Sequence, residues 1–382
     1  MTTKLETGVP LPPEVETEQK AEEQAEKKKP RARRKKASEA PNAAANLIAA
    51  LKFIAVAQKK VGTVPQQFCG ISGNWVVACN GVMMVGTKVE DDLTACPHTY
   101  QLIDALVKCG QELNITQLSA NVLSVKSDKF KALIPCVGFD ELELPQPDPQ
   151  IAAIDDRIKA AFDAVACLAT EGAPNAVHAA LLLQSGSAVA TNGFALVEYW
   201  HGIDLPPGML IPKASAVAVA KAGKPLVGFG YSGASATFWF DDGSFIKTQL
   251  FGERYPHYAG VINVEGLNPW PLPEEFFKGV HAVESFSKNG IVYFDNGVIS
   301  SREIETEATT YKVEGLPEGM GFQAKYLTTL EGAMQKAHFD KENNRVFFFG
   351  DNVRGVLMGV VLKQETSYNP TANAEFDDDI PF

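Results

Sequence analysis

The predicted order of helices and strands repeats three times between residues 42 and 362, and this repeat restricts the possible folds more than any single motif does. Each round of about 100 residues begins with a helix, continues with short strands, and then adds a second helix and further strands. A period of this length predicts three similar domains rather than a solenoid of small repeats. The expected helices lie at about 43–59, 98–112, 155–170, 212–223, 272–287 and 323–337.

The strands between these helices are predicted to pair in an antiparallel manner. Alternation of strands and helices is also typical of parallel βαβ units, so the connections decide between the two arrangements. Short segments such as "WFDDGSFI" at 239–246 and "ESFSKNGIVYF" at 284–294 have the length and composition of hairpin turns. We therefore expect an α+β fold, made of three similar domains of antiparallel sheets and paired helices.

The composition changes at both ends of the repeated region. Residues 1–41 combine low hydrophobicity with dense charge and are expected to be a disordered tail. The repeat predicts domains at 42–148, 149–260 and 261–362, with "PQPDP" at 145–149 as a linker between the first two. Residues 363–382 are expected to form a flexible acidic tail that ends in a docking tip.

The net charge of −11 argues at first against a nucleic-acid ligand. The two tails carry +2 (1–41) and −4 (363–382), which leaves −9 for residues 42–362. A DNA contact by the core therefore requires a local basic surface on an acidic body. The block "KKKPRARRKK" at 27–36 is either a solvated solubilising segment or an arm that binds phosphates through counterion release, and both interpretations stay open.

Several classes of protein are excluded by what the sequence lacks. It has no apolar run of the roughly 18 residues that a membrane helix needs, and its first thirty residues lack the apolar stretch of a signal peptide. The six cysteines are scattered without a CxxC pair or zinc spacing, which is typical of free thiols in a reducing cytoplasm. We expect a cytoplasmic protein without metal or cofactor.

No motif for chemistry is found either. The chain contains no P-loop, no HExxH, no GxSxG and no carboxylate cluster at metal-binding spacing in the core. The aspartate triplet lies on the predicted mobile tail, where a preorganised metal site is not expected. The histidines are isolated and are expected to be structural or surface residues, namely His98, His178, His201, His257, His281 and His338. The chain is therefore not expected to be an enzyme.

Three stretches in the repeated region resemble the bacterial DNA polymerase III beta subunit, the sliding clamp. They are "VATNGFALVEYW" (189–200), "LFGERYPHYAGVI" (250–262) and "GVLMGVVL" (355–362), and they occur in the family's order. The resemblance implies a ring of antiparallel sheets lined by helices, closed by head-to-tail association of identical chains, with a dimer expected by analogy. It further implies sequence-nonspecific binding of duplex DNA, with a DNA polymerase and a clamp loader as partners.

A helical inner wall would hold DNA through weak phosphate contacts that allow sliding. Cations on or beside the expected helices are candidates for these contacts, although for each one taken alone a solvated lysine or arginine is the favoured interpretation. They are Lys52, Lys59, Lys60, Lys108, Arg157, Lys159, Lys213, Lys221, Lys224, Lys278, Lys325 and Lys336. Their recurrence on all the expected helices favours a role in DNA binding.

The resemblance also implies a groove between the second and third domains in which polymerases and loaders dock short peptides. An apolar slot with a proline wall suits an extended peptide that inserts Leu and Phe side chains. Carried over position by position, the groove comprises Val177, Thr191, Gly193, Phe194, Leu196, Pro256, Val261, Val356, Leu357 and Met358. For Leu196, Val261 and Leu357 an ordinary place in the core is an equal alternative.

The last residues, "EFDDDIPF", resemble the acidic tip of bacterial single-stranded DNA-binding proteins, which docks replication and repair enzymes. The tip comprises Asp377, Asp378, Asp379, Ile380, Pro381 and Phe382. In this interpretation Phe382 enters an apolar pocket while its α-carboxylate meets an Arg or Lys at the rim, Pro381 lowers the cost of ordering, and the three aspartates steer the peptide to a basic surface. The tip raises an alternative, that the chain itself binds single-stranded DNA. Such a protein needs aromatics and cations interleaved on a strand platform, whereas Trp75, Trp200, Trp239 and Trp270 are scattered.

Overall fold

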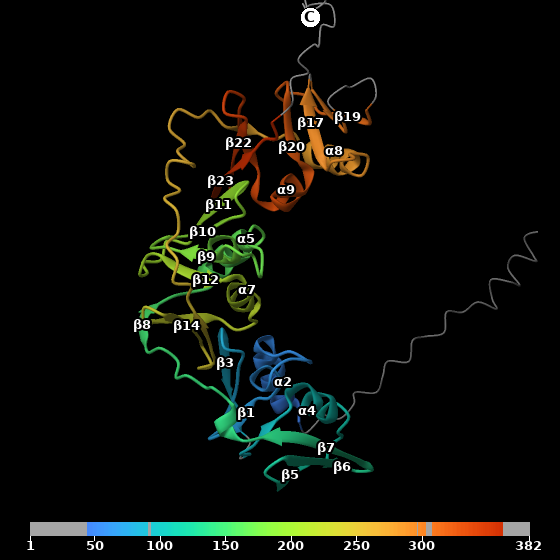
Figure 1. The fold of residues 1–382 in the computed structure, drawn as a ribbon, viewed down its shortest axis with the longest axis vertical. Coiled ribbons are helices and arrows are strands. Elements are labelled where there is room, and N and C mark those ends of the chain that lie inside the picture. Colours follow the sequence, from blue (N-terminus) through green and yellow to red (C-terminus); the bar gives the residue numbers. More distant parts are fainter. Residues whose placement is uncertain (1–43, 91–92, 296, 303–307, 362–382) are drawn as a thin grey trace, which may run out of the picture. The chain divides into compact units, whose positions relative to one another are not determined.

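The computed structural model describes residues 44–90, 93–295, 297–302 and 308–361, and the predicted tails at 1–41 and 363–382 lie outside them. Within the described residues the fold is α+β with antiparallel sheets, as expected (Figure 1). The boundaries proposed for three domains stay a prediction.

Each of the six expected helices is present and is shorter than expected. They are α2 (Ala45–Ile54), α4 (Thr99–Leu106), α5 (Arg157–Ala166), α7 (Lys213–Lys221), α8 (Phe276–Glu284) and α9 (Ala324–Thr329). Short helical turns that were not expected are α3 (Val64–Gln67), α6 (Ala176–Ala179) and η2 (Phe139–Glu141), whereas η1 (Ala55–Ala57) and η4 (Glu331–Ala333) lie inside the ranges expected for the first and last helices.

The prediction of a helix up to residue 337 is wrong, and it misplaced Lys336. Helix α9 ends at Thr329, and Lys336 begins β21 (Lys336–Asp340), where it pairs with Phe349 of β22 (Arg345–Gly350). Ala337, the next residue, is fully buried under the sheet. Pairing in the sheet therefore overrides the helix propensity of this segment. Lys59 and Lys60 likewise follow η1 and are not on a helix.

The first helix of each round buries the same pattern of positions. The buried residues are Leu47, Ala50, Leu51 and Ile54 in α2, Ile158, Ala161, Phe162 and Val165 in α5, and Phe276, Gly279, Val280 and Val283 in α8. This spacing places one apolar stripe along each helix. The second position is always small, and a Cβ added at Gly279 would lie 2.9 Å from Cδ1 of Ile299. The small residue lets the helix lie close to its sheet.

Two large sheets and two small sheets carry the helices. The first large sheet has the strand order β1-β2-β3-β15-β14-β13-β8, and the second has β12-β9-β10-β11-β23-β22-β21-β16. The small sheets have the orders β4-β7-β6-β5 and β19-β18-β17-β20. In Figure 1 the labelled helices lie on one side of these sheets, and α2 contacts α4, α5 contacts α7, and α8 contacts α9.

The strands fall into the same three rounds as the helices. Strands of the first round are β1 (Gly70–Ser72), β2 (Trp75–Cys79), β3 (Met83–Lys88), β4 (Cys96–Pro97), β5 (Asn114–Ser119), β6 (Val122–Ser127) and β7 (Phe130–Val137). Those of the second are β8 (Gln150–Ala153), β9 (Ala180–Leu183), β10 (Ser187–Thr191), β11 (Ala195–Trp200), β12 (Met209–Pro212), β13 (Leu226–Tyr231), β14 (Ser235–Phe240) and β15 (Phe245–Gln249). Those of the third are β16 (Trp270–Pro271), β17 (Ile291–Asp295), β18 (Val298–Ser300), β19 (Thr310–Lys312), β20 (Met320–Gln323), β21, β22 and β23 (Val353–Met358).

Each large sheet joins strands from two rounds of the repeat along a single seam. In the first sheet β3 pairs with β15, from Phe245 opposite Gly86 to Thr248 opposite Met83. In the second sheet β11 pairs with β23, with Leu196 opposite Val356. The predicted hairpin at 239–246 is present as the β14–β15 connection, where Gly243 has a φ of +80°. The prediction of a hairpin at 284–294 is wrong, because this segment connects the end of α8 to β17. Backbone hydrogen bonds across the seams thus connect successive rounds.

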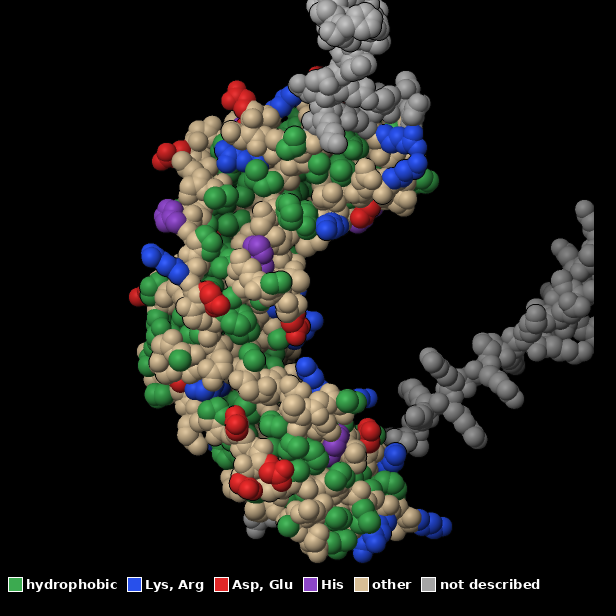
Figure 2. Space-filling view, in the orientation of Figure 1, with side chains coloured by type: hydrophobic (Ala, Val, Ile, Leu, Met, Phe, Trp, Pro, Cys, Tyr) green, Lys and Arg blue, Asp and Glu red, His purple; other side chains and the backbone are tan. Residues whose placement is uncertain are grey.

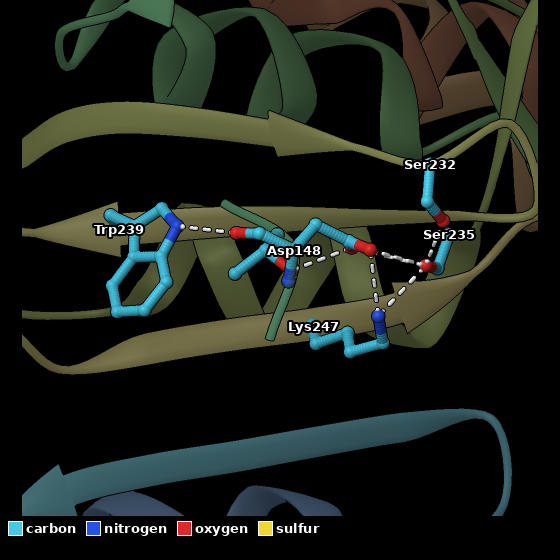
Figure 3. A network of polar contacts seen from close by, with 6 residues as sticks. Asp148, Ser232, Ser235, Trp239 and Lys247 are labelled. Atoms are coloured by element: carbon cyan, nitrogen blue, oxygen red, sulfur yellow. Dashed lines mark hydrogen bonds and ion pairs between the residues drawn. The ribbon is translucent and has the colours of Figure 1, made fainter. Parts of the chain in front are cut away.

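The segment predicted as a linker at 145–149 is anchored to the first large sheet by buried polar contacts (Figure 3). Asp148 accepts hydrogen bonds from Ser235 and Thr237 and forms an ion pair with Lys247 at 2.9 Å. The indole nitrogen of Trp239 donates to the backbone oxygen of Asp148 at 3.1 Å. The chain between the first two rounds is therefore held against β14 and β15 before it enters β8.

Candidate functional site

An apolar pocket of about 270 Å³ lies at the seam between β11 and β23. Its floor is formed by Leu196 of β11 and by Val356 and Met358 of β23, and one wall is the segment 255–261. The whole lining comprises Asn175, Val177, His178, Thr191, Gly193, Phe194, Ala195, Leu196, Tyr255, Pro256, His257, Tyr258, Val261, Val356 and Met358. We call this space the seam pocket.

The β10–β11 turn places Phe194 at the rim of the seam pocket. The side-chain oxygen of Asn192 accepts hydrogen bonds from the backbone N–H groups of Phe194 and Ala195, at 2.9 and 2.8 Å. Gly193 has a φ of +87°, which a residue with a Cβ rarely adopts. The exposed ring of Phe194 stacks on Tyr326 of α9, with ring centroids 5.6 Å apart. The rim is therefore apolar and held in place by a rigid turn.

The wall of the seam pocket is held by a buried polar network on the same face of the sheet. Glu198 of β11 is buried, and its carboxylate accepts hydrogen bonds from Ser187 at 2.9 Å and from the hydroxyl of Tyr258 at 3.2 Å. Arg354 of β23 pairs with the other oxygen of Glu198 at 2.7 Å. Burial, and next the Glu198 charge, raise the pKa of Tyr258 to about 12, so the hydroxyl keeps the proton that it donates.

Nine of the ten residues expected in the groove line the seam pocket, and Leu357 does not. Leu357 is fully buried on the opposite face of the sheet, where it packs in the main core under the helices. Its neighbours Val356 and Met358 line the pocket. The reason is the period of a strand, in which successive side chains point to opposite faces. Of the two alternatives for Leu357, groove or core, the structure therefore shows the core.

Six lining residues were not among the ten expected, and three of them come from one short stretch. Tyr255, His257 and Tyr258 belong to the stretch "RYPHY" around Pro256, while His178 follows Val177 on α6. Their aromatic character next to an expected wall residue is a signal that sequence reasoning could have used. The same stretch also borders a second cavity of about 750 Å³, whose other lining residues include Gln184 and Arg254. Tyr255 to Tyr258 thus separate two neighbouring cavities.

The predicted cations differ in whether they form an ion pair with an acidic side chain. Arg157 pairs with Asp155, Lys159 with Asp156, Lys224 with Asp242 and Lys278 with Glu275, at 2.7–3.1 Å. No ion pair with a described acidic residue is found for Lys52, Lys59, Lys60, Lys108, Lys213, Lys221, Lys325 or Lys336. An anion that approaches a paired cation must compete with its carboxylate, so the second group offers the more available positive charge.

Two of the available cations border a cavity between helices. Lys52 of α2 and Lys221 of α7, together with Lys224, line a cavity of about 690 Å³ with Phe53 and Val217 at its apolar side. Figure 2 shows Lys and Arg side chains in small groups interspersed with acidic ones, without a continuous basic field among the described residues of that face. The available charge is therefore local, and apart from Lys336 on β21 it lies on or beside helices.

The described residues offer no group of three or more His, Cys, Asp or Glu side chains that could hold a metal ion. The cysteines are free; five are buried and Cys167 is exposed. Burial raises the pKa of the Cys69 and Cys96 thiols to about 12. Among the described helices, none has both the length and the apolar character that a membrane crossing requires.

Comparison with known proteins places the fold. No protein-family model matches the chain, and no curated protein matches it. Solved structures do match: DNA polymerase III subunit beta from Pseudomonas aeruginosa has a TM-score of 0.70 at 13% identity, covering 83% of this chain and 98% of that chain. The DNA polymerase sliding clamp from Caulobacter crescentus has a TM-score of 0.70 at 18% identity, with the same coverage. The fold is sliding-clamp-like.

The sliding-clamp-like fold bears on the alternative of a single-stranded DNA-binding protein. That alternative required aromatics and cations on one strand platform. Trp75 and Trp239 both lie against Phe245, at 5.8 and 5.3 Å between ring centroids, whereas Trp200 lies against Arg354 and Trp270 against Phe339. The four tryptophans thus occupy three separate places on the clamp fold, and no common platform forms among the described residues.

Proposed function

We propose that this chain is a DNA sliding-clamp subunit, a processivity factor that encircles duplex DNA as a ring of identical chains and tethers a polymerase to it. The observation that carries the proposal is the clamp fold, with helices on one side of sheets that join successive rounds of the repeat. The protein would act by topological linkage and would catalyse no reaction.

The seams inside the chain support a specific way of closing the ring. In each round the strands before the second helix form a first group that ends at β3, β11 or β19, leaving aside β4, β12 and β20, which lead directly into that helix, and those after it form a second group that ends at β7, β15 or β23. Both internal seams pair the end of a first group, β3 or β11, with the end of the second group of the next round, β15 or β23. The corresponding strands that remain are β19 and β7. Among the described residues β19 pairs only with β18, and β7 pairs with β6 and touches β4 only at Cys136 and Val137. We infer that β7 of one chain pairs with β19 of the next.

The surface of β7 supports this inference. Leu133 on β7 has 56% of its surface exposed in the single chain, although it is a large apolar residue in the middle of a strand. An edge strand with unpaired N–H and C=O groups and an exposed leucine is a template for pairing with another chain. A head-to-tail contact of this kind closes into a ring when the rotation permits it, and two chains of three rounds each are the expected number.

The helices of the ring would face the DNA. Helices α2, α4, α7 and α9 carry or adjoin available lysines, and contacts between lysines and phosphates do not depend on base sequence. Weak, replaceable contacts of this type allow the duplex to slide. The remaining surface carries a net negative charge, so attraction of DNA phosphates is confined to the cations named above.

The seam pocket would dock short peptides from a polymerase and a clamp loader. It is apolar, and at about 270 Å³ it lies just below the roughly 300–1,000 Å³ of ordinary ligand sites, so it accepts a few side chains rather than a folded element. An extended peptide that inserts two or three apolar side chains fits these dimensions. Residues 377–382, outside the described part of the chain, would dock in turn on receptors of single-stranded DNA-binding protein tips, with the aspartates steering the encounter.

One experiment tests the ring. The protein is diluted until chains separate, mixed with nicked circular duplex, concentrated, and analysed by light scattering and by gel filtration with the DNA. We expect a ring-sized oligomer that stays on the circle and leaves it when a restriction enzyme linearises the DNA. A monomer at all concentrations, retention that survives linearisation, or tight stoichiometric binding of short single strands by a monomer would contradict the proposal.

A further inference from the structure

We propose that the seam pocket is occupied by the chain's own residues Ile380, Pro381 and Phe382, so that the acidic tip and the pocket cover each other until a partner displaces one of them. The inference rests on the proposed function, since it concerns the regulation of the same pocket. The tip of each chain is expected in the seam pocket of that same chain. The grounds are the exposed apolar rim of the pocket, the place where the described chain ends, and the charges beside the pocket.

The rim of the seam pocket exposes several large apolar side chains to solvent. Phe194, Val261 and Met358 are all large apolar residues with more than 40% of their surface exposed, and they border one pocket. Contiguous exposed apolar residues around a cavity mark a binding surface. Pro256 belongs to the same wall segment, 255–261, as Val261. A short segment with an aliphatic and an aromatic side chain is the matching ligand.

The described chain ends beside this rim. Met358 lines the pocket, and the backbone N–H of Val360 donates to Gly321 at 2.7 Å, which holds the strand up to its end. Residue 362 is four residues beyond Met358, so residues 362–382 start within about 14 Å of Met358, at 3.6 Å or less per residue. A flexible segment of the length between Val361 and Ile380 has a root-mean-square span of about 24 Å. This length is enough to reach the pocket. It is also short enough to keep the effective concentration of the tip at the pocket high.

The charges near the pocket complement the acidic tip. Arg254 lies next to Tyr255 of the wall, and Lys325 lies over the ring of Tyr326, which stacks on Phe194. Neither cation forms an ion pair with a described acidic residue. With Phe382 in the pocket, Asp377 to Asp379 would lie a few residues away and within reach of such cations. Glu198, the acidic group on this face, is already paired with Arg354.

The tether makes even weak binding effective. A short flexible linker holds its ligand at an effective concentration on the order of 1 mM. An intrinsic dissociation constant of about 0.1 mM would then leave the pocket about 90% occupied and weaken an external peptide about ten-fold. Partners that bind the pocket would release the tip, and receptors that bind the tip would free the pocket.

The test compares the full chain with a chain that ends at Val361, using a fluorescent decapeptide with the sequence of residues 373–382. We expect the shortened chain to bind the decapeptide about ten-fold more tightly than the full chain. In the full chain, the double substitution I380A/F382A should restore tight binding, while Phe376→Ala, a control in the same segment, should not. Equal binding by the full and shortened chains, or release by Phe376→Ala alone, would overturn the proposal.

A matched pair of variants locates the site. In the shortened chain Phe194→Ala should weaken binding of the decapeptide, whereas Phe286→Ala, an equally exposed phenylalanine away from the pocket (57% and 61% exposed), should not change it. Loss of binding in both or in neither would place the peptide elsewhere. A photo-crosslinking residue at position 382 should yield crosslinks within one chain, and crosslinks between chains would overturn the assignment to a single chain.

The outcome is separable from that of the proposed function. Ring formation and retention on circular DNA are measured with the same shortened chain. A ring that is retained on circles but does not bind the decapeptide rejects only the occupancy of the pocket by the tip. A chain that binds the decapeptide but never forms a ring rejects the clamp function and leaves the pocket and its ligand in place.

Discussion

Nζ of Lys247 lies 2.9 Å from Oδ1 of Asp148, and more than nine-tenths of each side chain is removed from solvent. The two residues are far apart in the sequence, one in the segment before β8 and the other in β15. Their pairing, with hydrogen bonds from Ser235 and Thr237, holds the connection between the first and second rounds of the repeat against the first large sheet (Figure 3).

Breaking this ion pair should destabilise the protein strongly. Lys247→Met leaves the carboxylate of Asp148 buried without its charge partner, which costs about 3–5 kcal/mol in comparable pairs. The matched control is Lys278→Met, which removes an exposed ion pair with Glu275 and should lower the free energy of unfolding far less. Chemical denaturation measures both free energies of unfolding. Equal values for the two variants would show that burial of the pair has no energetic consequence.

The same pair predicts how stability depends on pH. Burial raises the pKa of Asp148, but hydrogen bonds from Lys247, Thr237 and Ser235 and the charge of Lys247 outweigh it and hold the pKa below its ordinary value. A carboxyl group with a lowered folded-state pKa contributes stability above the unfolded value of about 3.9, and this contribution is lost as the pH falls through the folded pKa. We expect Asp148→Asn to be less stable at neutral pH. Its free energy of unfolding should also fall less than that of the unchanged protein as the pH is lowered. An unchanged pH profile would contradict this.

Ring closure predicts a difference between two leucines of one small sheet. Leu133 on β7 and Leu118 on β5 are equally exposed, at 56% and 55%. Leu133→Asp should weaken self-association at least about ten-fold, because burial of a leucine contributes about 1.5–3 kcal/mol and each 1.4 kcal/mol is a factor of ten. Leu118→Asp should leave it unchanged. Sedimentation over a concentration series measures both, and a reversed order would place the contact on β5.

The seam pocket should depend on the network behind its wall. Arg354→Met would leave the buried carboxylate of Glu198 without its cation, and we expect a loss of about 3 kcal/mol or more in stability together with weaker peptide docking. Tyr258→Phe removes one hydrogen bond to the same carboxylate and should cost about 1 kcal/mol. Denaturation and titration with the decapeptide check both variants. Docking that is unaffected by Arg354→Met would separate the network from the pocket.

DNA contact through available cations predicts an altered salt dependence. Replacing Lys52, Lys221 and Lys325 with alanine should reduce the slope of log affinity against log salt for duplex DNA by about 2.7, since each phosphate contact contributes about 0.9. The control replaces three exposed lysines that lie in strands or turns, Lys88, Lys126 and Lys341, and removes the same charge. Equal reductions in both triple variants would indicate general attraction rather than contact through the helices.

Much of the fold was predictable because it depends on local patterns. The spacing of Leu47, Ala50, Leu51 and Ile54 recurs in α5 and α8, and a helix needs only such a stripe to dock on a sheet. The turn at Asp241 to Gly243 is specified by its own residues. Lys336 was misplaced because alanine, glutamine and lysine favour a helix locally, while pairing with Phe349 holds the segment as a strand.

By itself, the sequence determined the order of the elements and the threefold repeat, because periodicity and turn chemistry act over a few residues. The nine expected residues that line the seam pocket came from the resemblance to the sliding-clamp family, carried over position by position. Tertiary structure alone decided that Leu357 faces the core between two pocket residues, that Asp148 of an apparent linker is buried against Lys247, and which cations are paired. It also decided that β3 joins β15 and β11 joins β23. These features depend on contacts between residues distant in the chain, where the face of a strand and the position of a partner charge are set by packing.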